Sequence, residues 1–204
     1  HDAIWRAICD EQCGIDHISR LDVSEYDAQI AAEVPDFEMH EAVDPKLAKR
    51  ADRFTRFALH CTQVAIDNSG LTIDEGTRND IGVLIGSGIG GMETWEEQFE
   101  RLLTRGPGRV SPFLVPMLIS DMASGLVSIM TGARGPNLTA VTACASATHS
   151  TGVAFDCIRH GRADVMITGG TEAAVTQTAL SGFCSARALS TRKNKKKKAC
   201  RPMD

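Results

Sequence analysis

Residues 135–172 contain a strand–turn–helix–strand unit, and this unit constrains the fold more than any other stretch of the chain. A run rich in β-branched residues, Leu138 to Thr142, predicts a strand, and a helix of about four turns is expected from Cys144 to Arg159. Gly161 is the expected end of this helix, and Asp164–Thr168 has the composition of a buried strand. Strands that alternate with helices indicate an α/β protein with a largely parallel sheet.

Cys144, at the turn of this unit, is the candidate nucleophile. The first N–H groups of a helix lack partners and the helix dipole favours negative charge, so this position favours the thiolate, which is the nucleophilic form of cysteine. The residues around it are small and leave room for a substrate (Ala143, Ala145, Ser146 and Ala147). A cysteine between alanines is also typical of a small buried hydrophobic residue, so position alone leaves both interpretations open.

Short motifs along nearly the whole chain resemble those of the β-ketoacyl-acyl carrier protein synthases, most closely the elongating type of fatty-acid synthesis. They occur in order as Gly86-Ser87-Gly88-Ile89-Gly90-Gly91, Ser111-Pro112-Phe113, Gly135-Pro136-Asn137, Thr142-Ala143-Cys144-Ala145-Ser146, Ala163-Asp164-Val165-Met166, Gly169-Gly170-Thr171-Glu172, Gly182-Phe183, the run from Ser185 to Arg192, and Cys200-Arg201-Pro202.

The resemblance implies a thiolase-like α/β fold, in which two similar halves form a five-layer α/β/α/β/α sandwich. Residues 1–204 would be an N-terminal β-ketoacyl synthase domain, incomplete at both ends and without the second half. Cys144 would accept an acyl chain from acyl carrier protein, and condensation with malonyl-acyl carrier protein, with loss of CO₂, would give the 3-oxoacyl product. No cofactor is implied, and a homodimer is. The family's two catalytic histidines and lysine belong to the second half, so these 204 residues alone are not expected to complete a condensation.

Further site residues follow from the resemblance by position. Ile89 matches the residue that gates the acyl pocket, Phe183 matches an aromatic residue of the pocket wall, and Leu114 matches a position that reaches the partner's acyl tunnel in the dimer. Plain core packing is the alternative for all three. Five basic residues match positions that meet the acidic carrier protein, although a solvated charged face is their ordinary explanation: Lys46, Lys49, Arg50, Arg109 and Arg187.

Composition limits the other functions. A net charge of −4 argues against general affinity for nucleic acid, and the longest apolar runs are too short to span a membrane. The seven cysteines are an odd number, dispersed and without a C-x-x-C pair, so we predict no metal site and ordinary thiols other than Cys144. Such thiols indicate a reducing compartment: the cytoplasm, or the mitochondrial or plastid matrix of a eukaryote.

The glycines after the predicted strand Ile81–Ile85 formally match a dinucleotide-binding fingerprint, Gly86-x-Gly88-x-x-Gly91, before a helix expected from Glu93 to Leu103. A second strand with an acidic end should follow about 20 residues on, but residues 105–112 are typical of a loop. We therefore interpret the glycines as positions where the backbone passes close to a packed neighbour.

Neither histidine of the helix that follows Cys144 can reach the thiol if this helix is regular. His149 would lie about 140° around the helix from the cysteine, and His160 roughly 24 Å along its axis. His17, His40 and His60 have no motif around them and are expected to be surface or hydrogen-bonded residues.

The other elements are expected from spacing and caps. They are an opening helix to Cys13, a short strand at Gln29–Val34, one long helix from Asp44 to Ser69 ended by Gly70, a helix at Asp121–Met130, a helix at Ala173–Ser181, and a loop from Ser185 to Asp204. Within this loop the run Lys195–Lys198 is expected to be mobile.

Three competing functions remain open at this stage. A polyketide-type ketosynthase shares the chemistry and differs only in substrate. A non-catalytic partner of the chain-length-factor type has the fold without the nucleophile, and Cys144 argues against it. The third is an inactive, truncated piece.

Overall fold

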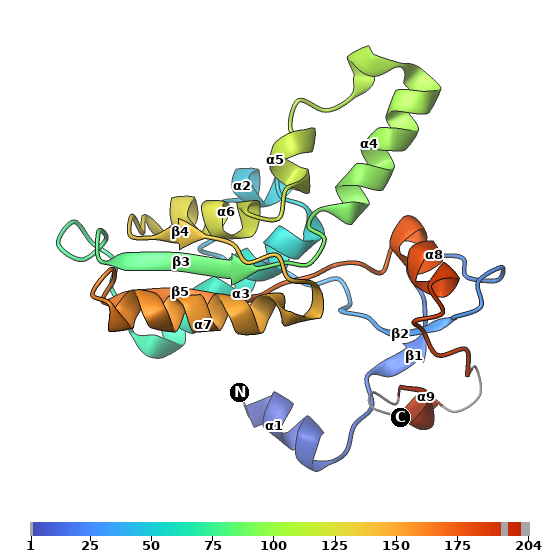
Figure 1. The fold of residues 1–204 in the computed structure, drawn as a ribbon, viewed down its shortest axis with the longest axis horizontal. Helices are drawn as coiled ribbons and strands as arrows, with labels where there is room; N and C mark the ends of the chain where they lie inside the picture. Colours follow the sequence, from blue (N-terminus) through green and yellow to red (C-terminus); the bar gives the residue numbers. More distant parts are fainter. Residues whose placement is uncertain (1, 193–195, 201–204) are drawn as a thin grey trace. The chain divides into compact units, whose positions relative to one another are not determined.

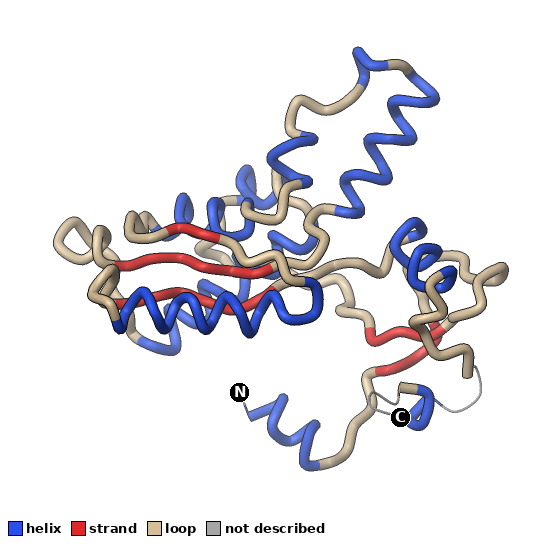
Figure 2. The backbone as a smooth tube through the Cα atoms, in the orientation of Figure 1, coloured by secondary structure: helices blue, strands red, loops and turns tan. Residues whose placement is uncertain are grey.

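The computed structural model describes residues 2–192 and 196–200. The chain forms two compact units, one of residues 38–174 and one of residues 1–37 together with 175–204 (Figure 1). Each unit has its own sheet (Figure 2).

The larger unit is built on a three-stranded parallel sheet in the order β4-β3-β5. Its strands are β3 (Ile81–Gly86), β4 (Asn137–Leu138) and β5 (Val165–Gly170). The register runs from Ile81 opposite Val165 to Gly86 opposite Gly170, so the two long strands end together. The expected strands at 81–85 and 164–168 are thus confirmed, whereas only the start of the β-branched run 138–142 pairs with the sheet.

Helices cover both faces of this sheet. Ile81, Val83 and Ile85 of β3 belong to one apolar cluster with α3 (Arg53–Ser69) and α6 (Met122–Thr131). The other face packs against α7 (Ser146–Arg159), which lies along β5 in Figure 1. Strands that are covered on both faces are apolar throughout, as β3 is.

Ser124 of α6 completes the hydrogen bonding where β4 is too short to do so. Its buried hydroxyl accepts a bond of 2.8 Å from the N–H of Ile85 and donates one of 2.7 Å to the carbonyl of Leu138. A buried polar group needs a partner, so this one side chain joins α6 to both strands.

The prediction of one long helix from Asp44 to Ser69 is wrong, because the chain forms two helices there, α2 (Pro45–Lys49) and α3. Asp52 has extended backbone angles and caps α3, where its Oδ1 accepts the N–H of Phe54 at 3.2 Å. Its other oxygen accepts the N–H and the hydroxyl of Thr94 at 2.9 and 2.6 Å, and this tertiary contact favours the break. The end at Gly70 is confirmed, with the left-handed φ of +67°.

An arm follows β3 and consists of α4 (Met92–Arg105), the short turn η1 (Pro107–Arg109) and α5 (Leu114–Leu118). The expected helix at 93–103 is α4, and α6 matches the helix expected at 121–130.

The smaller unit contains α1 (Asp2–Cys9), the antiparallel pair β1 (Ile15–His17) and β2 (Ile30–Ala32), α8 (Gln177–Ser185) and α9 (Lys196–Ala199). Its core consists of Ile18, Val23, Ala28 and Leu180.

Three expectations for the smaller unit need correction. The opening helix ends at Cys9 rather than Cys13. The helix expected at 173–181 begins four residues later, where the side chain of Thr176 caps it by accepting the N–H of Ala179. Residues 196–199, expected in a loop, form a short helix because lysine and alanine favour it, while Lys195 lies outside the described residues.

Candidate active site

Cys144 lies in a tight turn, η2 (Ala143–Ala145), immediately before α7, so the regular helix begins two residues later than expected. Ser146 fixes this turn, since its hydroxyl accepts the N–H of Thr142 at 2.9 Å and donates to the carbonyl of Ala143 at 2.7 Å. Ala143 has a φ of +52°, a left-handed conformation that is uncommon for a residue with a Cβ. Cys144 is exposed, so it is not the small buried hydrophobic residue that its neighbours also suggested.

Glycines at the ends of the two long strands let this turn sit directly on the sheet. A Cβ on Gly86 would lie 2.5 Å from the carbonyl oxygen of Ser146, and one on Gly170 would lie 2.5 Å from the Cβ of Ala147. Any larger residue at either position would push the first turn of α7 away. The interpretation of the glycines as sites of close backbone approach is therefore confirmed.

The amide of Cys144 faces no carbonyl partner. Among the backbone hydrogen bonds of the described residues outside regular helices, Ala145 donates to Thr142, but none is donated by Cys144. The turn therefore places an exposed thiol beside an N–H group that can donate a hydrogen bond to a substrate oxygen. Both lie at the start of a 14-residue helix. This is the arrangement that stabilises an oxyanion in acyl transfer.

Two of the predicted acyl-pocket residues belong to the same unit as Cys144. Ile89 is exposed and belongs to the glycine loop, residues 86–91 at the end of β3, and Leu114 begins α5 and is half-buried. Phe183 is on α8 in the smaller unit and is exposed. The roles of these residues in acyl binding stay predictions.

The glycine loop is held by Glu172, which the sequence analysis named only as part of a motif and gave no role. The carboxylate of Glu172, just beyond β5, accepts the N–H groups of Gly88 and Ile89 at 2.8 and 3.0 Å. The only signal in the sequence is a lone charged residue after Gly169-Gly170-Thr171 at the end of a buried strand.

The histidines of α7 hydrogen-bond within their own surroundings. His149 Nδ1 lies 2.7 Å from the hydroxyl of Thr142, and His160 Nδ1 lies 2.8 Å from the carbonyl of Asp156. The side-chain hydrogen bonds of the described residues include none between either ring and Cys144.

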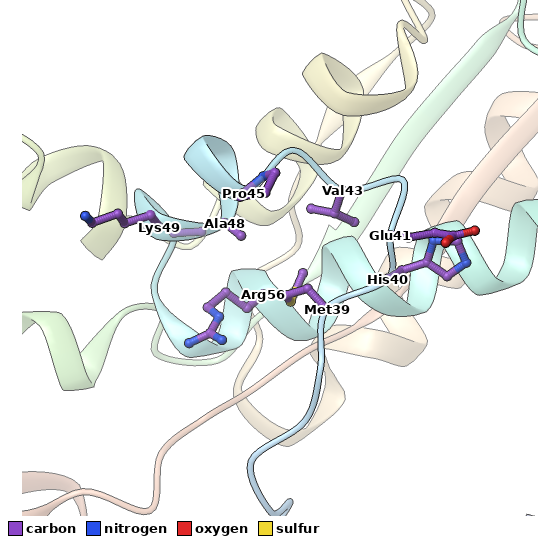
Figure 3. Close-up of a pocket in the computed structure, with 9 residues that line it drawn as sticks. Met39, His40, Glu41, Val43, Pro45, Ala48, Lys49 and Arg56 are labelled. Carbon is purple, nitrogen blue, oxygen red and sulfur yellow. The ribbon is translucent and has the colours of Figure 1, made fainter.

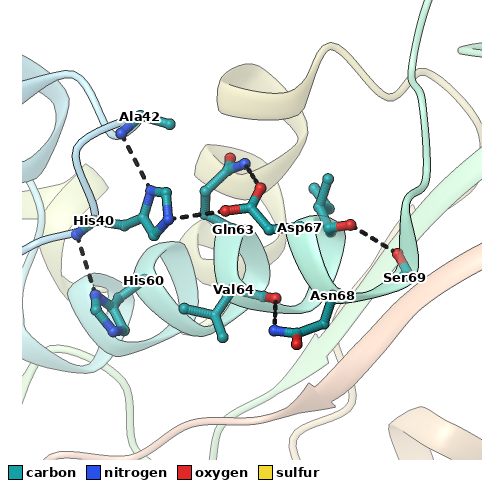
Figure 4. Close-up of polar contacts among 9 residues, drawn as sticks. His40, Ala42, His60, Gln63, Val64, Asp67, Asn68 and Ser69 are labelled. Carbon is teal, nitrogen blue, oxygen red and sulfur yellow. Dashed lines mark hydrogen bonds and ion pairs between the residues drawn. The ribbon is translucent and has the colours of Figure 1, made fainter.

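His40 and His60, which were expected to be surface or hydrogen-bonded residues, form a hydrogen-bond network that the sequence did not predict (Figure 4). His40 Nε2 is paired with Asp67 at 2.9 Å, and His40 Nδ1 accepts the N–H of Ala42 at 3.2 Å. The N–H of His40 donates to His60 Nδ1 at 3.1 Å. These bonds tie the segment before α2 to α3.

Three of the predicted docking residues are adjacent in space. Lys46 and Lys49 are exposed on α2, and Arg50 follows directly. The guanidinium of Arg50 lies 4.7 Å from the ring centroid of Phe113, a cation–π distance, so this residue also has a role within the fold. Arg109 is exposed at the end of η1.

Arg187, the fifth docking candidate, is exposed in the smaller unit. Its φ of +53° places it in the left-handed region. It lines a pocket of about 280 Å³ together with Asp27, Cys184 and Leu189.

A larger pocket, of about 510 Å³, opens beside α2 (Figure 3). Met39, Val43 and Pro45 give it apolar walls, and Lys49 and Arg56 add two cationic side chains. It adjoins the predicted docking helix rather than the Cys144 turn.

The described part of the chain contains no cluster of three or more His, Cys, Asp or Glu residues that could hold a metal ion. In residues 2–192 and 196–200, no helix has the length and apolar character needed to cross a membrane.

The chain is similar in sequence and in fold to known β-ketoacyl synthases. This chain is 51% identical over 189 residues to 3-oxoacyl-[acyl-carrier-protein] synthase 2 of Staphylococcus aureus, and the alignment covers 93% of this chain and 47% of that protein. A crystal structure of a beta-ketoacyl synthase from Burkholderia phymatum superposes with a TM-score of 0.88 at 24% identity, over 100% of this chain and 50% of that one.

A more distant structural match is the ketosynthase in a complex between a type II polyketide synthase acyl-carrier protein and its ketosynthase. It has a TM-score of 0.71 at 20% identity and covers 76% of this chain and 45% of that one. This chain thus spans about half the length of the relatives that it matches. These superpositions confirm the thiolase-like fold. Residues 1–204 match the family described as beta-ketoacyl synthase, N-terminal domain, and the chain belongs to that family.

Proposed function

We propose that this chain supplies the acyl-accepting part of a condensing enzyme of fatty-acid elongation, a 3-oxoacyl-acyl carrier protein synthase. The observation that carries the proposal is the exposed Cys144 on its fixed turn at the start of α7, with a free amide beside the thiol. The 51% identity to a synthase of this name supports fatty-acid rather than polyketide substrates. The presence of the cysteine speaks against a non-catalytic partner.

In the proposed reaction the thiolate of Cys144 attacks the carbonyl carbon of acyl-acyl carrier protein. The new C–S bond forms as the carrier thiolate leaves and takes up a proton, and the amide of Cys144 donates to the oxyanion in between. Malonyl-acyl carrier protein then loses CO₂, its carbanion attacks the cysteine thioester, and the Cys144 thiolate leaves. The two histidines and the lysine of the second step would come from the family's second half, outside these 204 residues.

The carrier protein is proposed to dock on the basic residues of α2. Lys46 and Lys49 are exposed there, and within the described residues neither forms an ion pair with an acidic side chain. An acidic partner would be steered to such a patch. We propose that Arg109 of the larger unit and Arg187 of the smaller unit also contact the carrier protein.

The larger unit exposes two apolar surfaces. We propose that one contacts a second copy of the chain and that the other contacts the family's second half. On α4 the rings of Trp95 and Phe99 stack at 5.0 Å, and both are exposed. We propose that this arm, with Leu114, faces a second copy of the chain. Phe155 and Ile158 are exposed on α7, and we propose that the family's second half covers them, as the five-layer fold requires. Large exposed apolar patches commonly mark such interfaces.

All seven cysteines are free, which supports a reducing compartment. We propose the cytoplasm, or an organelle matrix in a eukaryote.

The test of the proposed function is transfer of the acyl group itself. The complete protein is incubated with an acyl-acyl carrier protein, and the acyl adduct is mapped by peptide mass. We expect the adduct on Cys144, and its loss in Cys144→Ala. Cys61→Ala is the matched control, because Cys61 is another exposed cysteine of the same unit, and it should load normally. An adduct on a different residue, or none, would contradict the proposal, and preference for polyketide intermediates over fatty acyl chains would favour the alternative pathway.

A further inference from the structure

We propose that Glu172 is a positioning residue that holds the loop after β3, and with it the gate residue Ile89, in place, and thereby sets the chain-length preference of acyl loading. The inference rests on the proposed function, because Ile89 as gate and Cys144 as acyl acceptor are parts of it.

One carboxylate oxygen of Glu172 joins the ends of two neighbouring strands. Oε2 accepts the N–H of Gly88 at 2.8 Å and that of Ile89 at 3.0 Å, although these residues lie 84 and 83 positions earlier in the chain. The N–H of Thr171 also donates to the carbonyl of Gly86 at 2.9 Å, so the strand register carries Glu172 directly to the loop. Two successive amides that converge on one anion form a strong, directional anchor.

The anchored segment lies between Glu172 and the turn before the cysteine. A Cβ on Gly88 would be 2.9 Å from Oε2 of Glu172 and 3.5 Å from the Cα of Ala143. A side chain at Gly88 would therefore displace the carboxylate of Glu172. If the segment moved, its distance from the Cys144 turn would change.

The backbone position of Ile89 determines where its side chain points. A β-branched residue is stiff at χ1, so its side chain follows the backbone. Further along the loop, the N–H of Gly90 donates to Ser87 Oγ at 3.2 Å and the N–H of Gly91 donates to Leu118 O at 2.8 Å. Glu172 is the acceptor for the two amides nearest the gate. Without it, the Ile89 side chain would sample more positions, and the protein would discriminate less between long and short acyl chains.

The experiment compares Glu172→Ala and Glu172→Gln with wild type in the complete protein, using two measurements. The first is hydrogen exchange of the peptide that covers residues 86–91. The second is the ratio of the rates at which a long and a short acyl chain load Cys144 from acyl carrier protein. Glu75→Ala is the matched control, because it removes the same charge from an exposed loop position of the same unit, away from the proposed binding surfaces.

For Glu172→Ala we expect exchange at Gly88 and Ile89 to rise about tenfold and the long-to-short ratio to change about tenfold, which is about 1.4 kcal/mol for each. Glu172→Gln keeps one oxygen acceptor and should lie between this variant and wild type, while Glu75→Ala should match wild type. If Glu172→Ala does not fold, the same comparison is made with Glu172→Gln.

Unchanged exchange, or raised exchange with an unchanged chain-length ratio, would overturn the inference. A wild-type protein that loads no acyl chain on Cys144 would instead overturn the proposed function and with it the chain-length effect. The exchange measurement would still decide whether Glu172 holds the loop, so the two failures are distinguishable.

Discussion

Replacement of Asp52 should destabilise the larger unit far more than replacement of an ordinary helix cap. Asp52 is only 3% exposed and accepts three hydrogen bonds, one from the N–H of Phe54 and two from Thr94. It therefore caps α3 and also fixes the first turn of α4. Asp44 caps α2 through one exposed bond, from the N–H of Lys46 at 2.8 Å, and provides a control eight positions away.

The expected cost follows from these bonds. Asp52→Asn keeps a capping oxygen but replaces the other acceptor by an NH₂ donor, so at least one buried donor loses its acceptor. A buried polar group without a partner costs about 1–3 kcal/mol, so we expect a loss of about 2 kcal/mol. Asp52→Ala leaves three donors without acceptors, at about 3–9 kcal/mol, which is comparable to the whole stability of a typical domain, about 5–15 kcal/mol. Asp44→Ala should cost about 1 kcal/mol.

Urea unfolding of the complete protein tests these values. The fluorescence of Trp95, the residue after Thr94, reports on α4, and the midpoint shift multiplied by the slope gives the change in unfolding free energy. We expect Asp52→Asn to unfold at lower urea than Asp44→Ala, and Asp52→Ala to yield little folded protein. An Asp52→Asn midpoint equal to that of wild type, or above that of Asp44→Ala, would refute the reasoning.

Three further predictions concern the pocket, the docking surface and the response to acid. Ile89→Phe adds bulk at the proposed gate, so loading of long acyl chains on the cysteine should fall while short chains still load. An equal fall in loading for long and short chains would mean that Ile89 has a structural role and does not gate the pocket. The double variant Lys46→Glu, Lys49→Glu should raise the KM for acyl-acyl carrier protein several-fold, and added salt should weaken the wild-type interaction. An unchanged KM would mean that these lysines are ordinary solvated residues and do not bind the carrier protein. Burial raises the pKa of Glu33, but hydrogen bonds led by those from Ser19 outweigh it and leave that pKa below its ordinary value. Because the folded-state pKa is lowered, the stabilisation from Glu33 is present above the unfolded-state pKa and is lost as the pH falls through the folded-state pKa. Glu33→Gln removes this contribution, so the free energy of unfolding of the variant should fall less on acidification than that of wild type. An equal fall in both proteins would contradict this.

Much of the larger unit could be predicted from local sequence. The apolar run at Ile81–Ile85 can satisfy its backbone and bury its side chains only as a covered strand, and the left-handed Gly70 ends α3 without strain. The turn at Cys144 was also predictable, because small residues lie between a strand and a helix there. Exposure of the thiol was not predictable, since alanine neighbours are equally typical of a buried cysteine.

What the sequence could not decide are interactions between residues far apart in the chain. By itself, the sequence determined the α/β pattern, the cysteine at the turn and the glycines that follow β3. The tertiary structure decided the break before α3, because Asp52 meets Thr94 only after α4 has packed. It also decided the anchor of the glycine loop, because the parallel register brings Glu172 to the amides of Gly88 and Ile89. Helical spacing and caps act within a few residues, whereas these hydrogen bonds span 42 to 84 positions and exist only in the packed chain.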